Sequence, residues 1–429
     1  MVREADAGQT FTLRSGTHRG HSIEPKDGMS FVGEPGAILS GAEVLSGFAA
    51  QDGVWALNGV IPDSRNHGRC VAGYEGCSLT QDLFMDDVML WQVTDEDDLE
   101  TGRWYWDGDA VYIADDPTNR RIELSTVEYA FVGAADDVTI RGLGVEKYAT
   151  PAQDGAIQSQ EPGEGAFGEG WLIEDVDASG NHGAAVRTGN QTVVRNSRLH
   201  HNGQLGITCA GGTDVLIENN EIAHNNLAGF KWEWEAGGVK VTRSANLVFR
   251  GNSVHHNTGP GLWADIDTSD VLYENNRVVD NTGPGIFYEI SRNAVVRDNV
   301  VERNGLADSA WLWGAGILVA GSSNVEVYDN VVSANGNGIA GIQQDRGEGE
   351  FGPYLLADFY VHDNTVRLGD GRTGIVEDTG DKAVFEGRGN RFETNTYVGP
   401  TGRNYLWNNR RLGKEGWIAS GQDTNGMWR

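Results

Sequence analysis

The sequence has no long hydrophobic run, since no stretch approaches the roughly 20 apolar residues that a helix needs to cross a membrane. Its N-terminus, MVREADAGQTF, lacks the apolar core of a signal peptide. We therefore expect neither a helical anchor nor a membrane partner. The chain is either intracellular or secreted with its signal removed, and we expect a secreted protein.

Proline and basic residues are also scarce. Only 10 prolines accompany 60 glycines, and the absence of a Gly-X-Y period excludes collagen and disfavours low-complexity disorder. The 33 basic residues are outnumbered by 62 acidic residues, which gives a formal net charge of -29. The acidic residues are spread along the chain, and this pattern indicates a solvated acidic surface. Nucleic acid is therefore not expected as a partner.

Cysteine is rare as well, with three residues in the chain. Cys70 and Cys77 flank a short glycine-containing loop, and this spacing allows them to pair. Cys209 falls at an inward strand position and is expected to be a small core residue. The cysteine pattern by itself leaves the redox compartment open.

Internal repeats dominate the sequence from about Val138 onward. Each repeat contains an alternating strand, then Asn or Asp, then a short apolar strand, then a second Asn-Gly-type turn and a third strand that opens with Gly-apolar-x-apolar. The repeats are VTIRGLGVEKY at 138, WLIEDVDASGNHG at 171, TVVRNSRLHHNG at 192, VLIENNEIAHNN at 215, LVFRGNSVHHNTG at 247, VLYENNRVVDNTG at 271, AVVRDNVVERNG at 294, VEVYDNVVSANG at 325 and FYVHDNTVRLGDG at 359. Spacings from the low twenties to the low thirties suit one solenoid coil with loops of variable length. The sequence therefore predicts an all-β fold, a right-handed parallel β-helix with almost no α-helix.

Two columns of asparagine run through these repeats. Asparagine tolerates left-handed turn geometry, and in register its carboxamide can bond to the next coil, so both columns are interpreted as structural. The first column holds Asn220, Asn252, Asn276, Asn299, Asn330 and Asn364, and the second holds Asn202, Asn225, Asn257, Asn281, Asn304 and Asn335.

Changes in composition and repeat pattern along the chain divide it into four parts. Residues 1–42 are predicted to form the N-terminal rungs, and residues 43–132, which are aromatic and turn-rich, a small β-rich insertion. Residues 133–398 are predicted to form the main β-helix, and residues 399–429, with tryptophans that look exposed, to cover its open end.

The third strand of each repeat carries the candidate chemistry. These strands are predicted as GAAVRTG at 183, GITCAGG at 206, GFKWEWEAGG at 229, GLWADIDTSD at 261, GIFYEISRN at 285 and GILVAGSSN at 316. If the residue after glycine points inward, period two places a column of outward carboxylates on three successive coils, namely Glu233, Asp265 and Glu289. The neighbouring outward residues are Lys231, Trp263 and Phe287 on one side and Glu235 and Asp267 on the other.

Crowded carboxylates beside aromatic residues favour catalysis over a merely solvated acidic face. Strands about 4.8 Å apart bring such groups close enough to raise one another's pKa. Carboxylates on adjacent coils come near the ~5 to 5.5 Å separation of retaining glycosidases, and those two coils apart approach the ~6.5 to 9.5 Å of inverting ones. The alternative is a calcium site, for which Glu235 and Asp267 are the candidate ligands.

Lys231 suggests a second chemistry, because a lysine beside metal-binding carboxylates can remove the proton α to a uronate carboxyl in polysaccharide β-elimination. An anionic polymer would need basic residues at the outward positions. Only Arg187 and Arg292 are candidates, which weakens the lyase hypothesis. Trp263 and Phe287 are the candidate platform for a sugar ring. Trp311 and Trp313, in a longer loop, either wall the groove or pack on the solenoid.

Histidines form a further column, with His201, His224 and His256 just before the second asparagine and with His200 and His255 beside two of them. In later repeats this column becomes Asp280 and Arg303, which is typical of a solvent-facing turn. We therefore do not predict a histidine metal site from the sequence.

The repeats and asparagine columns resemble the pectate-lyase-like superfamily of right-handed β-helix proteins over most of the chain. The insertion after the first rungs is similar to arrangements in several β-helix glycoside hydrolases. The Asp-Pro-His motif of alginate epimerases, the Arg-x-Pro-x-x-Arg motif of pectate lyases and the Gly-His-Gly of polygalacturonases are absent, which makes those three activities unlikely. The resemblance is specific for the fold and carries no assigned activity. From the crowded carboxylates and the aromatic residues beside them, we hypothesise an enzyme acting on a polysaccharide or oligosaccharide, a glycoside hydrolase rather than a lyase. The alternative class is a non-catalytic glycan-binding or adhesive β-helix.

Overall fold

The computed structural model describes residues 2–60, 64–163, 165–399 and 402–429. The chain divides into two units, the first made of residues 1–192, 197–208 and 225–236 and the second of residues 193–196, 209–224 and 237–429. Each unit contains parallel strands in three sheets, and each coil of the chain contributes one strand to each sheet. No helix among the described residues is long and apolar enough to span a lipid bilayer.

The first unit begins with the coils that the N-terminal sequence predicts. Its parallel strands pair in register through short apolar segments, of which Phe31 and Ile140 are an example of directly paired core residues. The strands of its three sheets are, in order, β1 (Thr10–Leu13), β3 (Ser30–Gly33), β14 (Thr139–Arg141) and β17 (Leu172–Glu174); β2 (Gly16–Arg19), β4 (Ala37–Ser40), β15 (Gly144–Glu146), β18 (Asp177–Ser179) and β21 (Arg198–His200); and β13 (Phe131–Val132), β16 (Gly155–Gln158), β19 (Ala184–Arg187) and β22 (Leu205–Ala210).

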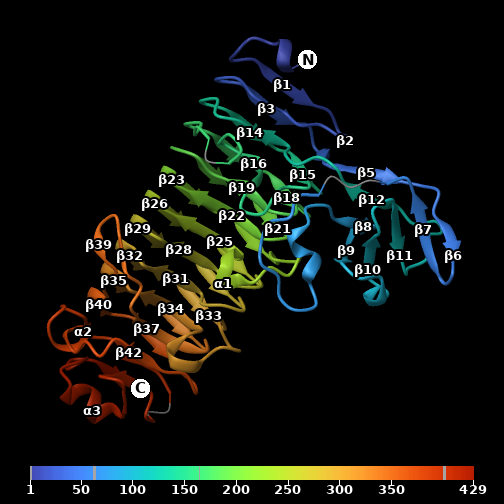
Figure 1. Cartoon of the computed structure of the whole chain (residues 1–429). Coiled ribbons are helices and arrows are strands. Elements are labelled where there is room, and N and C mark those ends of the chain that lie inside the picture. The colour runs from blue at the N-terminus through green and yellow to red at the C-terminus, as the bar shows by residue number, and fades with distance from the viewer. Residues whose placement is uncertain (1, 61–63, 164, 400–401) are drawn as a thin grey trace. The chain divides into compact units, whose positions relative to one another are not determined.

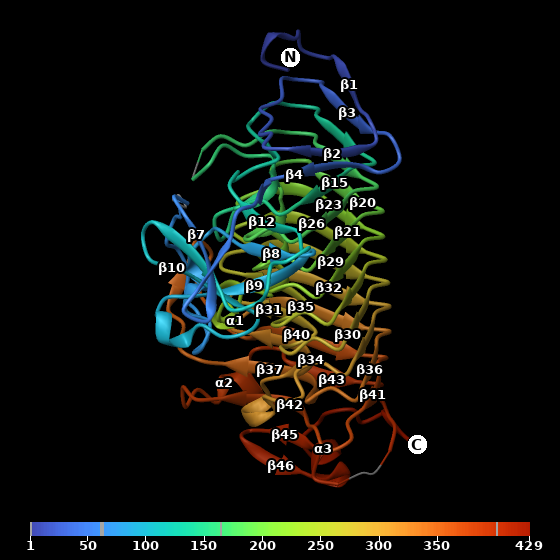
Figure 2. The same cartoon turned by 90° about the vertical axis from the view of Figure 1, so that its right-hand side faces the viewer.

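A largely antiparallel sheet interrupts these coils. It runs in the order β5-β12-β8-β9-β10-β11-β7-β6, and only β9 and β10 pair in parallel. Its strands are β5 (Ala42–Leu45), β6 (Ala49–Gln51), β7 (Val54–Asn58), β8 (Leu83–Met85), β9 (Val88–Val93), β10 (Arg103–Trp106), β11 (Ala110–Ile113) and β12 (Ile122–Ser125). Trp104, fully buried, lies in a core of its own with Leu83 and Ile113. The insertion, several of whose strands are labelled in Figure 2, is thus a small β domain with its own hydrophobic core.

The second unit is a longer stack of the same coils (Figure 1). Its first sheet contains β20 (Val193–Arg195), β23 (Thr213–Glu218), β26 (Ala245–Arg250), β29 (Ser269–Glu274), β32 (Arg292–Arg297), β35 (Ser323–Tyr328), β40 (Ala357–His362) and β43 (Arg391–Glu393). Its second contains β24 (Glu221–Ala223), β27 (Ser253–His255), β30 (Arg277–Val279), β33 (Val300–Glu302), β36 (Val331–Ser333), β41 (Thr365–Arg367), β44 (Thr396–Tyr397) and β47 (Met427–Trp428). Its third contains β25 (Gly237–Thr242), β28 (Leu262–Asp265), β31 (Ile286–Glu289), β34 (Ala315–Ala320), β37 (Asn337–Gln343), β42 (Thr373–Glu377), β45 (Tyr405–Trp407) and β46 (Arg410–Leu412).

Side-chain alternation fills the interior of this unit. In the first sheet, Leu247, Val271 and Ala294 pair directly on successive coils and are almost fully buried. Their neighbours along each strand face outward. In the second sheet, Val254, Val278 and Val301 stack in the same way. The predicted fold class, a right-handed parallel β-helix with a small β insertion and a C-terminal cap, is confirmed.

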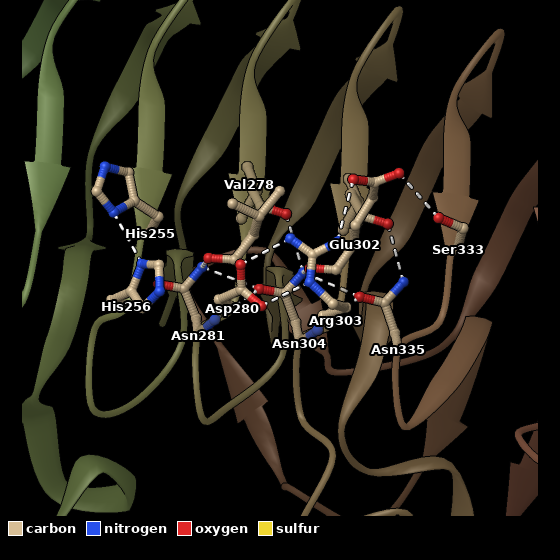
Figure 3. Close-up of polar contacts among 12 residues, drawn as sticks. His255, His256, Val278, Asp280, Asn281, Glu302, Arg303, Asn304, Ser333 and Asn335 are labelled. Atoms are coloured by element: carbon tan, nitrogen blue, oxygen red, sulfur yellow. Dashed lines mark hydrogen bonds and ion pairs between the residues drawn. The ribbon is translucent and has the colours of Figure 1, made fainter.

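The predicted first asparagine column forms a continuous hydrogen-bonded ladder. The backbone and side-chain amides of Asn252 both donate to Asn276 Oδ1 at 3.0 Å, and those of Asn276 donate to Asn299 Oδ1 at 2.9 and 3.0 Å. The ladder continues beyond the predicted members to Asn395, whose two amides donate to Asp423 Oδ1. In the second column, Asn281, Asn304 and Asn335 bond in the same pattern (Figure 3).

The reason expected for asparagine at these positions was partly wrong. The left-handed conformation is adopted not by the column asparagines but by the residue before each of them, such as Asn275 (φ 57°) before Asn276 and Asp280 (φ 57°) before Asn281. The column residues are selected for their buried amide bonds, and the residue before them for its tolerance of a positive φ.

The C-terminal segment covers the last coil with aromatic side chains. Trp417, on α3 (Lys414–Ala419), is fully buried against Phe392 and Tyr405, with ring centroids 5.1 and 5.2 Å apart. The tryptophans of this tail were expected to be exposed, but Trp407 and Trp417 fill the end of the core instead. The other helical segments are η1 (Val2–Glu4), η2 (Glu75–Ser78), η3 (Glu96–Asp98), α1 (Trp232–Glu235), η4 (Ala310–Leu312) and α2 (Ala383–Glu386).

Candidate active site

The third sheet of the second unit brings together two of the predicted carboxylates. Strand β28 pairs in parallel with β31, with Trp263 opposite Phe287 and Ala264 opposite Tyr288. Asp265 and Glu289 are the next residues along the two strands, so they extend the same register. Both are 5% exposed. The structure therefore places Asp265 and Glu289 on adjacent coils, as the sequence predicts.

The third predicted member of this column is wrong in its position. Residues Trp232–Glu235 form the short helix α1 rather than a strand, and Glu233 is exposed on it. The strand that pairs with β28 is β25, in which Lys240 lies opposite Trp263 and Thr242 opposite Asp265. Thr242, rather than Glu233, therefore lies opposite Asp265, and Lys240, rather than Lys231, lies opposite Trp263.

Aromatic packing explains why the segment before β25 is helical. Phe230 is 1% exposed and packs with Trp234, Cys70 and Cys77 in one apolar cluster of the first unit. Phe230 also forms a β-bridge with Cys70, and Cys70 and Cys77 form a disulfide. The insertion thus holds this segment away from the β-helix register, a contact that the repeats alone do not reveal.

Each buried carboxylate of the pair has a basic partner. Lys240 Nζ lies 3.1 Å from Asp265 Oδ2, and the Arg346 guanidinium forms an ion pair with Glu289 Oε1. Lys240 is only 4% exposed, and its ammonium also lies 3.6 Å from the centroid of the Trp263 ring. Charges taken out of water need such partners, because the desolvation of a single buried carboxylate is very costly.

Glu289 differs from an ordinary surface carboxylate in its protonation. Burial raises the pKa of Glu289, and the neighbouring charge of Asp265 raises it further, while Arg346 and Lys240 lower it without cancelling the rise. The neutral acid of Glu289 therefore persists to a higher pH than that of a solvated glutamate. Two adjacent carboxylates in unequal environments are the arrangement that separates an acid role from a charged role.

The two aromatic rings do not form the open platform that the sequence predicts. Trp263 and Phe287 stack on each other with centroids 5.4 Å apart and are 4% and 2% exposed. The Lys240 ammonium lies over Trp263, and the rings of Trp313 and Phe287 meet edge to face with their centroids 6.2 Å apart. Trp313 therefore packs on the solenoid, which is one of the two alternatives for its loop. The rings of Trp263 and Phe287 are packed beside the carboxylates and are not exposed to a ligand.

A hairpin between β37 and β40 lies against the same strands. It is formed by β38 (Glu348–Gly349) and β39 (Gly352–Pro353). The Glu350 backbone amide donates to Asp267 Oδ1 at 3.2 Å, and the Arg292 guanidinium lies 3.3 Å from the centroid of the Phe351 ring. Arg346, at the base of the hairpin, reaches Glu289. The hairpin and its base thus contact the residue after Ile266, the end of β31 and the start of β32.

Two cavities flank the hairpin. One of about 380 Å³ is lined mainly by polar residues, including Gln344, Arg346, Tyr354 and Asp378. The other, of about 160 Å³, is lined by Asp267, Arg292 and Phe351 among others. Burial and a hydrogen bond to Asp267 raise the pKa of Tyr354 to about 12, so its hydroxyl stays protonated. Arg346 therefore links a polar surface cavity to the buried Glu289.

The other predicted site residues have protein partners in the first unit. Arg187 is buried and ion-paired with Asp154, with 2.6 Å between Nη1 and Oδ1. Glu235 Oε2 accepts a hydrogen bond of 2.8 Å from the Gln153 side chain. Lys231 is exposed at the start of α1. Arg187 and Glu235 therefore both bind other side chains of the first unit.

A counting signal in the sequence could have identified Lys240. Gly238, Gly261 and Gly285 lie nine or ten residues before Leu247, Val271 and Ala294, the first core residues of the next alternating strands. The glycine chosen from the sequence, Gly229, lies 18 residues before Leu247. The motif Gly-Gly-Val-Lys-Val-Thr at 237 fits the shared spacing, and the motif at 229 does not.

Comparisons with known proteins agree with this architecture. Residues 165–332 match the family described as right-handed β-helix region. No curated protein sequence matches the chain. Among solved structures, the chain is similar to XylC in complex with xylose (TM-score 0.68, 15% identity, covering 92% of this chain and 79% of that one). It is also similar to the A-module of the Azotobacter vinelandii mannuronan C-5 epimerase AlgE6 (TM-score 0.53, 14% identity, covering 98% and 91%). At these identities the likeness establishes the fold.

Proposed function

We propose that this chain, a right-handed parallel β-helix protein, is a carbohydrate-active enzyme that hydrolyses glycosidic bonds with Asp265 and Glu289. One observation carries the proposal: the two carboxylates lie on adjacent paired strands, both 5% exposed, and burial raises the pKa of Glu289. Their adjacency favours the retaining mechanism, since strands about 4.8 Å apart match the ~5 to 5.5 Å carboxyl separation of that class.

The unequal environments assign the two roles. Glu289 is the general acid and gives its proton to the leaving glycosidic oxygen, while Asp265, which is ion-paired with Lys240, attacks the anomeric carbon as the C–O bond breaks. Glu289, now ionised, then takes a proton from water, whose oxygen attacks the anomeric carbon and releases Asp265. The step consumes one water per bond cleaved and returns both groups to their starting states.

Substrate must displace Arg346 for this chemistry to occur. Arg346 lines the polar cavity of about 380 Å³ and pairs with Glu289. The hairpin that carries it has glycines in the left-handed region at Gly347 (φ 77°) and Gly352 (φ 95°), where the chain changes direction without a side-chain penalty. We propose that a sugar entering the cavity moves the Arg346 guanidinium off Glu289 and frees the acid for the reaction.

The first test is a panel of aryl glycosides and oligosaccharides that begins with xylosides, because XylC was determined with xylose. On the best substrate, Asp265→Asn should reduce the rate to background. Glu289→Gln should reduce it by about 100-fold to 10,000-fold for a poor leaving group, and much less for dinitrophenolate, which needs no acid. A slow 2-deoxy-2-fluoro substrate should leave a covalent adduct on the peptide that contains Asp265.

Two further variants make the test specific. Glu302→Gln, which changes a partly exposed carboxylate on β33, is the matched control and should keep the wild-type rate. Glu233→Gln decides whether the exposed glutamate of α1 takes part, as the sequence predicts. If wild-type protein cleaves no glycoside, or if both pair variants keep full activity while circular dichroism shows an intact fold, the proposed function is wrong.

A second candidate activity is β-elimination on a uronate polymer, and one observation supports it. Lys240, rather than the predicted Lys231, is the buried lysine beside the carboxylates, 3.1 Å from Asp265. A lysine in this position is suited to remove the proton α to a carboxyl group, and Arg346 is suited to bind that carboxylate. Elimination gives an unsaturated, ultraviolet-absorbing product, whereas hydrolysis gives a saturated reducing end.

We also propose that the protein works outside the reducing cytosol. The disulfide between Cys70 and Cys77 supports a secreted or periplasmic location, because disulfides persist in oxidising compartments. Isolation of the protein from its source in native form, followed by thiol labelling before and after reduction, tests this location. Two free thiols at Cys70 and Cys77 in the native protein would contradict it.

A further inference from the structure

Three histidines of the second unit converge on the row of turns that follows the second sheet. His224 follows β24, and His255 and His256 occupy the end of β27 and the next residue. Each offers one ring nitrogen, and these nitrogens all lie within 4.8 Å of one another. The rings of His224 and His256 stack at 5.0 Å, and His255 stands edge-on to both, at 5.7 and 5.2 Å. The three imidazoles therefore form one cluster on two neighbouring coils.

The contacts of His255 fix which of its nitrogens faces the cluster. His255 Nε2 lies 3.3 Å from Glu221 Oε1. On the other side of the ring, His255 Nδ1 lies 3.0 Å from His256 Nδ1, a contact that Figure 3 shows. A carboxylate only accepts, so Nε2 carries the hydrogen, and in the neutral ring the Nδ1 lone pair points at His256. A histidine whose outer nitrogen is held by a carboxylate and whose inner nitrogen is directed at other imidazoles has the usual arrangement of a metal ligand.

We propose that His224, His255 and His256 bind a divalent transition-metal ion, with zinc as the best-fitting cation. Imidazole nitrogen suits zinc, copper, nickel and cobalt, and three histidines with one open position are a common ligand set for zinc. Two nitrogens on one tetrahedral zinc ion, each at ~2.0 to 2.1 Å, lie about 3.3 Å apart. His255 Nδ1 and His256 Nδ1 are already 3.0 Å apart, so this pair needs only a small opening.

The neighbouring turn limits the site to these histidines. Asp280, which occupies the His256 position on the next coil, is held by Arg303 through two bonds of 2.7 Å. A fourth ligand is therefore water rather than Asp280. The site was not predicted from the sequence because the histidine column changes to Asp280 and Arg303 in later repeats, although the convergence of three histidines needs only two neighbouring coils.

The site links two coils of the solenoid. His224 belongs to the coil of β23 and β24, and His255 and His256 belong to the coil of β26 and β27, which pairs with it through β24 and β27. A bound ion would fasten the turns of these coils together. Because metal binds the folded state, saturation with zinc should raise the melting temperature of the protein.

The test is calorimetric titration of zinc chloride into untagged, chelator-treated full-length protein. Wild type should bind one zinc ion at this site, and cobalt should give the visible absorption bands of a low-symmetry, imidazole-rich site. His255→Ala and His256→Asn should each weaken zinc binding by more than about 100-fold and abolish the zinc-dependent rise in melting temperature. Asparagine is chosen at 256 because it tolerates the positive φ of 55° there.

The chain offers a matched control in its other histidine pair. His200 and His201 in the first unit repeat the arrangement, with 2.8 Å between their Nδ1 atoms and 2.8 Å between His200 Nε2 and Asp177 Oδ1. The double variant His200→Ala/His201→Asn should keep zinc binding at the three-histidine site. Glu221→Gln should weaken zinc binding by about 10-fold to 100-fold, as expected for a residue that orients a ligand.

The outcomes separate clearly. No zinc binding by wild type, or unchanged binding in both His255→Ala and His256→Asn, would overturn the proposal. Loss of binding in the His200/His201 control but not in the site variants would place the metal elsewhere and also refute it. The readouts are binding and melting, so they do not depend on whether the protein hydrolyses a glycan.

Discussion

Replacing Asn276 with alanine should cost the protein a measurable part of its stability. Asn276 is 1% exposed and lies in the middle of the first asparagine ladder. Its side-chain oxygen accepts from the backbone and side-chain amides of Asn252, and its side-chain amide donates to Phe249 O at 2.8 Å and to Asn299 Oδ1 at 3.0 Å. The substitution removes all four of these contacts.

The magnitude follows from which groups lose their partners. The Asn252 side chain keeps a bond of 2.8 Å to Ile217 O, and Asn299 Oδ1 keeps the backbone amide of residue 276. The Asn252 backbone amide, however, is left buried without its acceptor, and Phe249 O loses a side-chain donor. One orphaned buried donor costs about 1 to 3 kcal/mol, and the other lost bonds add to it, so we expect destabilisation of about 2 to 4 kcal/mol.

The assay is urea denaturation followed by circular dichroism, with Arg277→Ala as the matched control. Arg277 is the next residue, its side chain is 53% exposed, and its ion pair with Glu302 is long at 3.4 Å, so its loss should change stability by less than about 0.5 kcal/mol. Hydrogen exchange of the peptide around Asn252 should accelerate in Asn276→Ala. Equal midpoints for the two variants would refute the ladder as a source of stability.

Three further predictions concern the candidate site and its surroundings. Arg346→Ala should shift the basic limb of the pH profile of kcat/KM to higher pH, because Arg346 lowers the pKa of Glu289 and the acid must be protonated to react; an unmoved limb would contradict this role. Reduction of the Cys70–Cys77 disulfide should lower the free energy of unfolding by about 2 to 3 kcal/mol in urea titrations, with no effect of reductant on a variant lacking both cysteines. Calcium, for which the sequence suggests Glu235 and Asp267 as ligands, should give a calorimetric signal that is lost in Asp267→Asn, and a flat wild-type titration would remove calcium from the mechanism.

The architecture could be predicted from the sequence because each coil encodes its own strands. Period-two alternation determines which side chains enter the core, and the asparagine columns determine the register, so the amino-acid sequence alone suffices to place Asp265 and Glu289 on adjacent coils. These local patterns recur in many coils, so a wrong assignment in one coil is corrected by comparison with the others.

The parts that failed depend on contacts between distant segments. Phe230 and Trp234 pack against Cys70 and Cys77 of the insertion, and this contact makes α1 a helix where the repeat suggests a strand. Arg346 reaches Glu289 from a hairpin whose sequence has no repeat pattern. Lys240 was missed for a simpler reason, because its motif fits the spacing of the neighbouring coils and only required counting.

The end of the asparagine ladder gives the solenoid a chemical direction. Each asparagine donates two hydrogens toward the coil that follows it, so every coil supplies donors on one side and an acceptor on the other. Asp423, whose carboxylate accepts from Asn395 and also from Tyr397 and Trp417, completes the series with a residue that needs no further acceptor. Asp423 therefore ends the ladder, because its carboxylate accepts hydrogen bonds and donates none to a further coil. A C-terminal truncation that removes Asp423 would therefore leave the buried backbone amide of Asn395 without its acceptor, while the side-chain amide of Asn395 would keep its bond of 3.0 Å to Val361 O.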